Sequence, residues 1–413
     1  SRICITCSFF VSRILFSRWI FLPFIFYSVQ WTCVYYYDYF NPEAPQLAGE
    51  HLLPDREKWC VMDNVIQPSR RIKSDRITLI LHMSSDYLSE DIAEHFHNWS
   101  GPIALTIVLN DVRRFGCTVL FIQSLIARHR FDMVQVHFIY KKDSLERCHN
   151  DAVKSLFSPN TQTLCSKIVM KRSLMDVADY PMNMARNVAR QYIRTEFLLL
   201  SDVDLLFSGG FERRMSEVAR RELKESDKKA LVFRIFEVYN QTSTPRTKWE
   251  LSQLMNSGDA DVFHVHAAFG AHGLAGTSLW FSKPENFTHT NVAAAPIRYS
   301  RYTWEPRFVS RSSVPFHDEA FPYRYRANSV LGWEMCRAGY EFTLVEDLFT
   351  FHRGKRVNDP DRRNENHKIQ LMNRLKYERA LAGFYRRMDE EYPETKGSCP
   401  AILRRIMWFF KEE

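Results

Sequence analysis

The sequence contains no internal repeat and no low-complexity segment, which excludes repeat arrays and compositionally biased disordered chains. Beyond residue 37 it has neither a Cys-x-x-Cys spacing nor a Cys/His pattern of the zinc-finger type, so structural zinc is not expected. It also lacks a basic helix, because the Lys and Arg behind the net charge of +8 are dispersed among Asp and Glu. This dispersion argues against nucleic acid as a partner and fits an anionic substrate.

What the sequence does contain is an ordinary globular composition with many aromatic residues. Hydrophobic residues make up 45% and charged residues 25% of the 413 residues, enough for one large or two moderate domains. Aromatic residues reach 14%, and several tryptophans lie in the second half of the chain. Aromatic rings line many sugar-binding clefts, but large hydrophobic cores use them as well. The composition therefore predicts a folded domain and leaves the role of its rings open.

An uncharged run from Trp19 to Tyr36 is long enough to cross a bilayer. Arginines precede this run and acidic residues follow it, so the positive-inside rule predicts a cytosolic N-terminus and a lumenal body. A cleaved signal peptide is the alternative, although the run is longer than a usual signal core and no small-x-small site follows it directly. We expect a cytosolic tail at 1–18, a transmembrane signal anchor at 19–37 and a stem at 38–75.

Two further features agree with a lumenal body. Sequons for N-glycosylation begin at Asn98, Asn240 and Asn286. Beyond the anchor there are six cysteines, an even number that suits an oxidising compartment. They are Cys60, Cys117, Cys148, Cys165, Cys336 and Cys399. Their pairing has fifteen solutions and cannot be read from the sequence.

After the stem, short apolar runs alternate with helical patterns. Strands are predicted at 77–81, 103–109, 134–139 and 197–200, and helices at 85–99, 112–129 and 180–194. This alternation predicts an α/β fold with a mostly parallel, mixed sheet and helices on both faces. We expect this domain to span 76–395 and a C-terminal tail or helix to span 396–413. Ligands of such sheets bind beyond the carboxyl ends of the strands.

The chain contains an Asp-x-Asp pattern at three places, so the pattern alone has little value. The pair Asp259/Asp261 lies in a loop-like stretch, and Asp359/Asp361 lies among proline and arginines. Only Asp202/Asp204 directly follows a buried strand, the apolar run at 197–200. The context therefore selects Asp202 and Asp204 as the candidate site.

Asp202 and Asp204 flank Val203, and in an extended stretch both carboxylates would point to one face. Two carboxylates so close together repel each other unless a positive charge lies between them. A hard divalent cation with oxygen ligands, Mn²⁺ or Mg²⁺, would supply that charge and keep positions open for diphosphate oxygens. The alternative is a pair of solvated turn or helix-cap residues.

Two segments of the chain resemble a known signature. Tyr180-Pro-Met-Asn-Met-Ala-Arg-Asn-Val-Ala, followed by Thr195-Glu-Phe-Leu-Leu-Leu-Ser-Asp-Val-Asp, resembles the long motif of glycosyltransferase family 49, which includes the LARGE-type enzymes and the β-1,4-glucuronyltransferases. The likeness runs from Ile77 to His352. It implies the GT-A fold, a UDP-sugar donor and binding of Mn²⁺ (or Mg²⁺) by Asp202 and Asp204.

The resemblance also assigns roles to residues outside the acidic pair. Arg186 and Asn187 match the motif on the helix before the metal strand, and they are expected to face the nucleotide. An alternative for Arg186 is a buried ion pair that holds this helix to the sheet. His352 closes a late strand and is expected to complete the metal shell.

The sequence departs from the family at 320–328, where both glycines and the lysine of the motif are replaced. Tyr323 and Tyr325 stand at the glycine positions and are expected to fill space there. An acidic residue in this part of the chain is expected to remove the acceptor hydroxyl's proton. The candidate bases are Asp318, Glu319 and Glu334. Glu334, on a predicted helix, could instead only anchor an arginine.

Together these features predict an inverting, metal-dependent glycosyltransferase in the Golgi lumen, a single-pass type II membrane protein. It would transfer a sugar, with β-linked glucuronic acid as the leading choice, from a UDP-sugar to a glycan or glycoprotein acceptor. Another UDP-sugar donor, carrying GlcNAc, galactose or xylose, is an alternative. A catalytically inactive glycan-binding relative is a second, and a transmembrane adhesion protein is a third that the strand-helix alternation disfavours. The sequence leaves open whether the chain forms a homodimer.

Overall fold

The computed structural model describes residues 58–142, 147–155, 177–239, 243–265, 270–325, 327–354 and 360–400. All of them belong to one compact unit. The predicted anchor at 19–37 and residues 38–57 of the predicted stem lie outside the described residues, whereas Trp59–Ile66 of that stem forms a strand of the sheet. Within these ranges no helix combines the length and the apolar character needed to cross a membrane.

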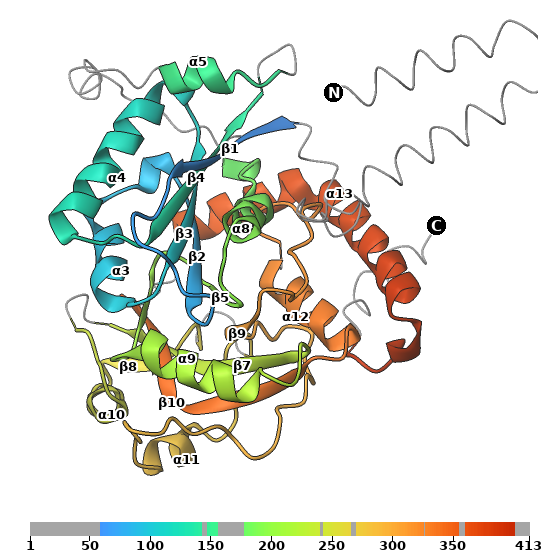
Figure 1. Ribbon diagram of the computed structural model, residues 1–413. Coiled ribbons are helices and arrows are strands. Elements are labelled where there is room, and N and C mark those ends of the chain that lie inside the picture. The colour runs from blue at the N-terminus through green and yellow to red at the C-terminus, as the bar shows by residue number, and fades with distance from the viewer. Residues whose placement is uncertain are drawn as a thin grey trace, which may run out of the picture. The chain divides into compact units, whose positions relative to one another are not determined.

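A ten-stranded mixed sheet forms the centre of this unit (Figure 1). The strands run in the order β1-β4-β3-β2-β5-β9-β7-β10-β6, and β8 pairs with β7. The pairs β4–β3, β3–β2, β2–β5 and β7–β10 are parallel, and the other pairs are antiparallel. The strands are β1 Trp59–Ile66, β2 Ile77–Ser84, β3 Ile103–Leu109, β4 Val134–Lys141, β5 Phe197–Leu200, β6 Leu205–Phe207, β7 Lys229–Val238, β8 Ala260–Val262, β9 Phe308–Arg311 and β10 Glu341–Arg353.

Helices cover both faces of the parallel strands, with α3 and α4 on one flank and α8 and α13 on the other (Figure 1). The α-helices are α3 Ala93–Asn98, α4 Phe115–His129, α5 Asn150–Ser155, α8 Met182–Gln191, α9 Phe211–Glu222, α10 Lys248–Ser257, α11 Thr277–Ser282, α12 Ala327–Arg337 and α13 Pro360–Glu391. Short 3-10 turns lie at η2 Ser85–Tyr87, η3 Glu90–Ile92, η4 Val112–Arg114 and η5 Pro393–Thr395.

The two-residue period of the strands explains this layering. In β2, Leu79 and Leu81 pack into the core under α3, α4 and α9, whereas Ile80 packs into a second core with α12 and α13. Both faces of β2 are therefore buried, and the strand reads as a continuous apolar run. This burial fixes the register of the parallel strands, and with it the place where their carboxyl ends meet.

Two of the structural predictions need correction. The strands β4, β3, β2 and β5 run parallel, but the edge strand β1 is antiparallel to β4, and beyond β5 only β7 and β10 form a parallel pair. The predicted helix at 85–99 is also interrupted, because Ser84 and Ser89 each accept a backbone N–H and begin separate short turns.

Disulfides join distant parts of the described chain. Cys60 is bonded to Cys148, and Cys336 to Cys399. Cys117 is disulfide-bonded as well. The first bond ties β1 to the segment before α5, and the second ties the end of α12 to the C-terminal segment. The structure thus selects pairings that the sequence left open.

Candidate active site

Asp202 and Asp204 lie in the tight turn that links β5 to β6, at the carboxyl end of the parallel strands. The Ser201 amide donates to the Ile80 carbonyl at 3.1 Å, and the Leu205 amide closes the turn on the Asp202 carbonyl at 3.2 Å. The two aspartates are therefore not in an extended stretch. Their side chains have different partners.

Asp202 is held between two arginines from different elements. Arg186 of α8 donates from Nη2 to Oδ1 at 2.9 Å, and Arg307, just before β9, donates from Nη2 to Oδ2 at 2.6 Å. Burial raises the pKa of Asp202, but the charges of Arg307 and Arg186 outweigh it and hold the pKa well below its usual range. The alternative role of Arg186, an ion pair that ties its helix to the sheet, is thus present in the structure.

Asp204 faces His352 instead. The pairing of β6 with β10 sets Leu205 opposite His352, and this register brings His352 Nε2 to 3.5 Å from Asp204 Oδ2. The other ring nitrogen, Nδ1, lies 3.1 Å from the Gly354 carbonyl and donates to it. Burial lowers the pKa of His352, but the hydrogen bond and charge of Asp204 raise it further than burial lowers it.

The donor atoms of this pair fit a divalent cation. One carboxylate oxygen and one imidazole nitrogen converge, and the Gly354 carbonyl holds a proton on Nδ1, so Nε2 could ligate a metal ion in place of its hydrogen bond to Asp204. The Asp204 side chain is 60% exposed, so the pair is open to ligands. Asp202 binds the two arginines in this structure, and among the described residues no group of three or more His, Cys, Asp or Glu side chains is arranged to hold a metal ion.

Several buried nitrogens around Asp202 lack a hydrogen-bond partner in the described part of the chain. They are Arg186 Nη1, Arg307 Nε and His82 Nε2. His82 Nε2 lies 3.9 Å from Asp202 Oδ1, and His82 Nδ1 is bonded to the Tyr180 hydroxyl at 2.8 Å. Burial and the neighbouring Arg186 lower the pKa of His82 to about 3, so the ring is neutral. Unpaired buried donors are uncommon in folded proteins and mark a place prepared for a further acceptor.

Glu305 is a residue of this site that the sequence did not single out. It lies two residues before Arg307, and its Oε2 is 4.0 Å from Nε2 of His272. Burial raises the pKa of Glu305, and Arg307 offsets this only in part. Burial also lowers the pKa of His272 to about 3, so this ring does not neutralise the carboxylate. The sequence shows only an acidic residue between Trp304 and Pro306, a pattern without a motif.

The acidic residues that the sequence selected as bases lie in another cluster. Arg387 of α13 binds Asp318 Oδ2 at 3.0 Å and Glu334 Oε1 at 2.9 Å, and all three side chains are largely buried. Glu319 accepts a hydrogen bond from Asn187 at 2.8 Å, and Asn187 also donates to the His317 carbonyl. Glu334 therefore anchors Arg387, as the alternative interpretation of Glu334 proposed. Asn187 holds the loop at 317–319 against α8.

The Arg387 cluster yields a stability prediction. We expect Arg387→Met to lower the free energy of unfolding by about 3–5 kcal/mol, because Asp318 and Glu334 would stay buried without their cation. Urea unfolding with the disulfides intact measures the loss. Arg386→Met, at an exposed neighbour on the same helix, should change it by less than about 0.5 kcal/mol. Equal losses in the two variants would contradict a structural role for the cluster.

A small, open hollow of about 40 Å³ adjoins the site through Tyr180. Its lining includes Trp59, Tyr323, Lys141 and Lys376. Tyr323, at one of the replaced glycine positions, packs edge-on against Tyr180 with ring centroids 5.3 Å apart. Tyr325, at the other replaced position, stacks instead on Tyr377 of α13 at 4.2 Å. Of the two tyrosines that replace the motif's glycines, Tyr323 thus lines the hollow and Tyr325 packs against α13.

Comparison with known proteins gives relatives of one kind. β-1,4-Glucuronyltransferase 1 of Danio rerio is 23% identical over 357 residues, which cover 81% of this chain and 78% of that protein. Xylosyl- and glucuronyltransferase LARGE1 of Homo sapiens is 26% identical over 287 residues, 68% of this chain and 31% of that protein. The chain thus spans about a third of the length of LARGE1.

Similar solved structures include S. aureus TarS 1–349 in complex with UDP, with a TM-score of 0.33, 11% identity, and coverage of 81% of this chain and 78% of that one. GalNAc-T7 with UDP, GalNAc and Mn²⁺ gives a TM-score of 0.36 at 7% identity, and covers 68% of this chain and 44% of that one. Both similarities are too low to identify the fold family by themselves.

The family profile described as glycosyl-transferase for dystroglycan matches residues 76–393. The match covers well over half of the 413 residues. It includes the turn with Asp202 and Asp204, the arginines beside it, Glu305 and His352. The expected resemblance is thereby confirmed, and the chain belongs to this family of glycosyltransferases.

Proposed function

We propose that the chain is a metal-dependent, inverting GT-A glycosyltransferase that moves a sugar, with glucuronic acid as the leading choice, from UDP to a glycan. The observation that carries this proposal is that the two aspartates after β5 have different partners. Asp202 holds two arginines in place, and Asp204 faces His352 at 3.5 Å. Two arginines on one side of the site and a solvent-exposed carboxylate–imidazole pair for a metal ion on the other suit a nucleoside diphosphate.

The arginines are assigned to the donor's diphosphate. Arg186 Nη1 and Arg307 Nε lack protein acceptors among the described residues, whereas other nitrogens of the same guanidinium groups are fixed by Asp202. A guanidinium that is already oriented loses little entropy when it binds phosphate oxygens. Asp204 and His352 would hold Mn²⁺ or Mg²⁺, whose Lewis acidity stabilises the negative charge of the departing UDP.

Glu305 is assigned the role of general base. It would accept the proton of the acceptor hydroxyl as that oxygen bonds to the anomeric carbon and the bond from this carbon to the diphosphate breaks. Attack from the face opposite the leaving group inverts the configuration. A carboxylate whose pKa is raised by burial is a stronger base than an ordinary one, which favours Glu305. Asp318 and Glu334 are less suited, because both are paired with Arg387.

The hollow beside Tyr180 is assigned to the acceptor glycan. The rings of Tyr180 and Tyr323 line it and could contact sugar C–H groups, whereas its lysines, Lys141 and Lys376, are both paired with Asp179. The Golgi lumen, the type II topology and the anchor at 19–37 remain part of this proposal. The disulfides Cys60–Cys148 and Cys336–Cys399 support the lumenal location, because such bonds persist in oxidising compartments.

A thermal-shift panel of UDP-sugars with and without Mn²⁺ tests the proposal. We expect UDP-glucuronic acid to raise the Tm only when Mn²⁺ is present, with a stabilisation of about 2.7 kcal/mol at a ligand concentration one hundred times Kd. Transfer assays with the sugar that stabilises the protein follow. A larger increase in Tm with UDP-GlcNAc, UDP-galactose or UDP-xylose would make that nucleotide sugar the proposed donor in place of UDP-glucuronic acid. Binding without hydrolysis or transfer would indicate the inactive relative, and no shift with any UDP-sugar would contradict the proposal.

A further inference from the structure

The sequons at Asn98 and Asn286 differ in what their side-chain amides already do; the sequon at Asn240 lies outside the described residues. Asn98, the last residue of α3, donates from Nδ2 to the Phe207 carbonyl at 2.8 Å, and its Oδ1 accepts the Phe207 amide at 2.7 Å. This two-point pairing joins α3 to β6. The Nδ2 hydrogen in this pairing is the one that lies on the same side of the C–N bond as Oδ1.

That same position is the one a glycan needs. A glycosylated asparagine side chain is a secondary amide, and secondary amides strongly prefer the trans form. The sugar carbon then lies on the same side as Oδ1, in the place where Asn98 holds its hydrogen bond to Phe207. The following residue, Trp99, is only 1% exposed. A glycan on Asn98 would therefore break the link between α3 and β6.

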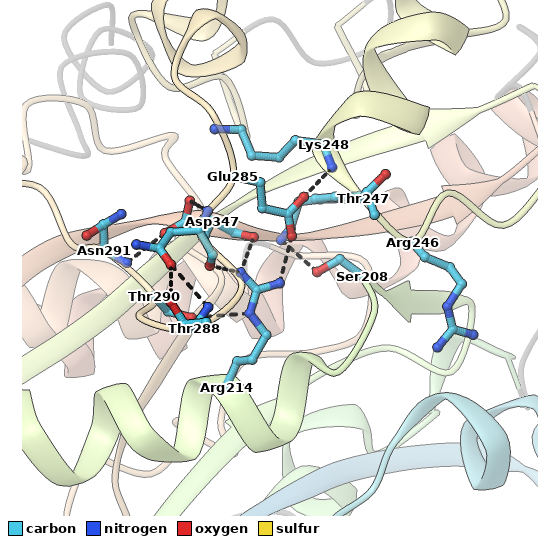
Figure 2. A network of polar contacts seen from close by, with 12 residues as sticks. Ser208, Arg214, Arg246, Thr247, Lys248, Glu285, Thr288, Thr290, Asn291 and Asp347 are labelled. Atoms are coloured by element: carbon cyan, nitrogen blue, oxygen red, sulfur yellow. Dashed lines mark hydrogen bonds and ion pairs between the residues drawn. The ribbon is translucent and has the colours of Figure 1, made fainter.

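Asn286 has a different environment. Its backbone is pinned: the N–H donates to Asp347 Oδ1 at 3.1 Å, and the carbonyl accepts from Arg214 Nη2 at 2.9 Å. Figure 2 shows Arg214 reaching from α9 into this network beside Glu285 and Asp347. The loop is thus held from its buried side by charged groups that bind the main chain.

The side chain of Asn286 belongs to a partly exposed residue and keeps its amide nitrogen unused. Its Oδ1 accepts from the Thr288 amide, the Thr288 hydroxyl and the His289 amide, at 3.1, 3.0 and 2.9 Å. Its Nδ2 donates to no acceptor in the described part of the chain and is not among the buried unpaired nitrogens. Phe287 and Thr288 are both exposed. An asparagine with a free amide nitrogen on a rigid, outward-facing loop can carry a bulky group without loss of any contact.

We propose that Asn286 carries an N-linked glycan and that Asn98 does not. The inference rests on the proposed lumenal location. In the modification, the anomeric carbon of an oligosaccharide linked to a lipid diphosphate bonds to Nδ2. The bond from that carbon to the diphosphate breaks, the lipid diphosphate leaves, and Nδ2 loses one proton. The glycan would project from the loop between α11 and β9 and leave the Asp202 site unobstructed.

Expression of the full chain in cells with a secretory pathway tests the inference. The protein is digested with trypsin, and its peptides are treated with peptide-N-glycosidase F in heavy-oxygen water, which releases each glycan and converts its Asn to labelled Asp. The peptides are then sequenced by mass spectrometry. We expect the label at 286 and none at 98. Asn286→Gln and Thr288→Ala should each remove one glycan from the intact protein, whereas Thr288→Ser, which keeps the sequon, and Asn98→Gln should remove none.

The outcomes separate this inference from the proposed function. A chain with formed disulfides and an unmodified Asn286 would overturn the inference and leave the lumenal glycosyltransferase in place. A label at 98 would overturn the exclusion of Asn98. A chain with neither disulfides nor any glycan would overturn the lumenal location, and the inference would fall with it. Loss of a glycan in Asn98→Gln alone would also contradict the geometry described here.

Discussion

Asp204→Asn is expected to lower Mn²⁺-dependent transfer by about a hundredfold or more, since the variant lacks a charged ligand facing His352. The fold should be unaffected. The Asp204 side chain is 60% exposed and its polar partner is a histidine, so we expect the free energy of unfolding to change by less than about 0.5 kcal/mol. Initial rates across a Mn²⁺ titration, together with urea unfolding, measure both quantities.

Two further variants make the experiment specific. Asp361→Asn changes an exposed aspartate of another Asp-x-Asp pattern, on α13, and should leave activity unchanged. Asp202→Asn should lose activity and also stability, because Arg186 and Arg307 would stay buried without their counter-charge. If Asp204→Asn kept full activity in metal-free buffer, the assigned metal role would be wrong. If Asp202→Asn were as stable as the wild type, the separation of the two aspartates into different roles would be wrong.

Glu305→Gln is expected to reduce kcat by about a hundredfold to ten-thousandfold with little change in the Kd for UDP, because the amide cannot accept the acceptor's proton. The pH profile provides a second readout. The base must be deprotonated, and burial raises the pKa of Glu305 above its ordinary value. The wild-type rate should therefore fall as the pH drops through that raised pKa, and this acid limb should be missing in the variant.

The control for Glu305 is an exposed carboxylate. Glu90→Gln, on the surface at η3, should leave both kcat and the pH profile as in the wild type. Glu305→Asp keeps the carboxylate and should retain part of the activity that Glu305→Gln loses. Unchanged kcat in Glu305→Gln would exclude it as the base. Glu319 would then be the next candidate, because Asp318 and Glu334 are both paired with Arg387 inside the protein.

The parallel half of the fold could be predicted because its signals are local. The strands at 77–81, 103–109 and 197–200 are apolar on both faces, and a strand buried on both sides leaves a continuous apolar run in the sequence. Apart from the late strand that His352 closes, the other half escaped prediction for the opposite reason. Its strands β6, β8 and β9 are three or four residues long, too short to show a period.

Within the site, the sequence by itself determined the position of Asp202 and Asp204, because a buried strand followed by acidic residues is a contiguous pattern. It also selected Arg186 and His352, through a resemblance to the family. Only the tertiary structure decided that the two aspartates serve different partners. The register of β6 against β10 brings His352 to Asp204, and the antiparallel pairing of β9 with β5 brings Arg307 to Asp202.

The base illustrates the same division. Asp318, Glu319 and Glu334 were selected because acidic residues occur in that part of the chain, but sequence does not reveal which carboxylates are already paired. Arg387, 53 positions from Glu334, supplies the partner that occupies two of them. Glu305 carries no motif, and its raised pKa arises from burial beside groups that lie far apart in the chain. The sequence determines which charged side chains are present. Strand register and burial determine which carboxylates are paired with an arginine and which remain available as a base.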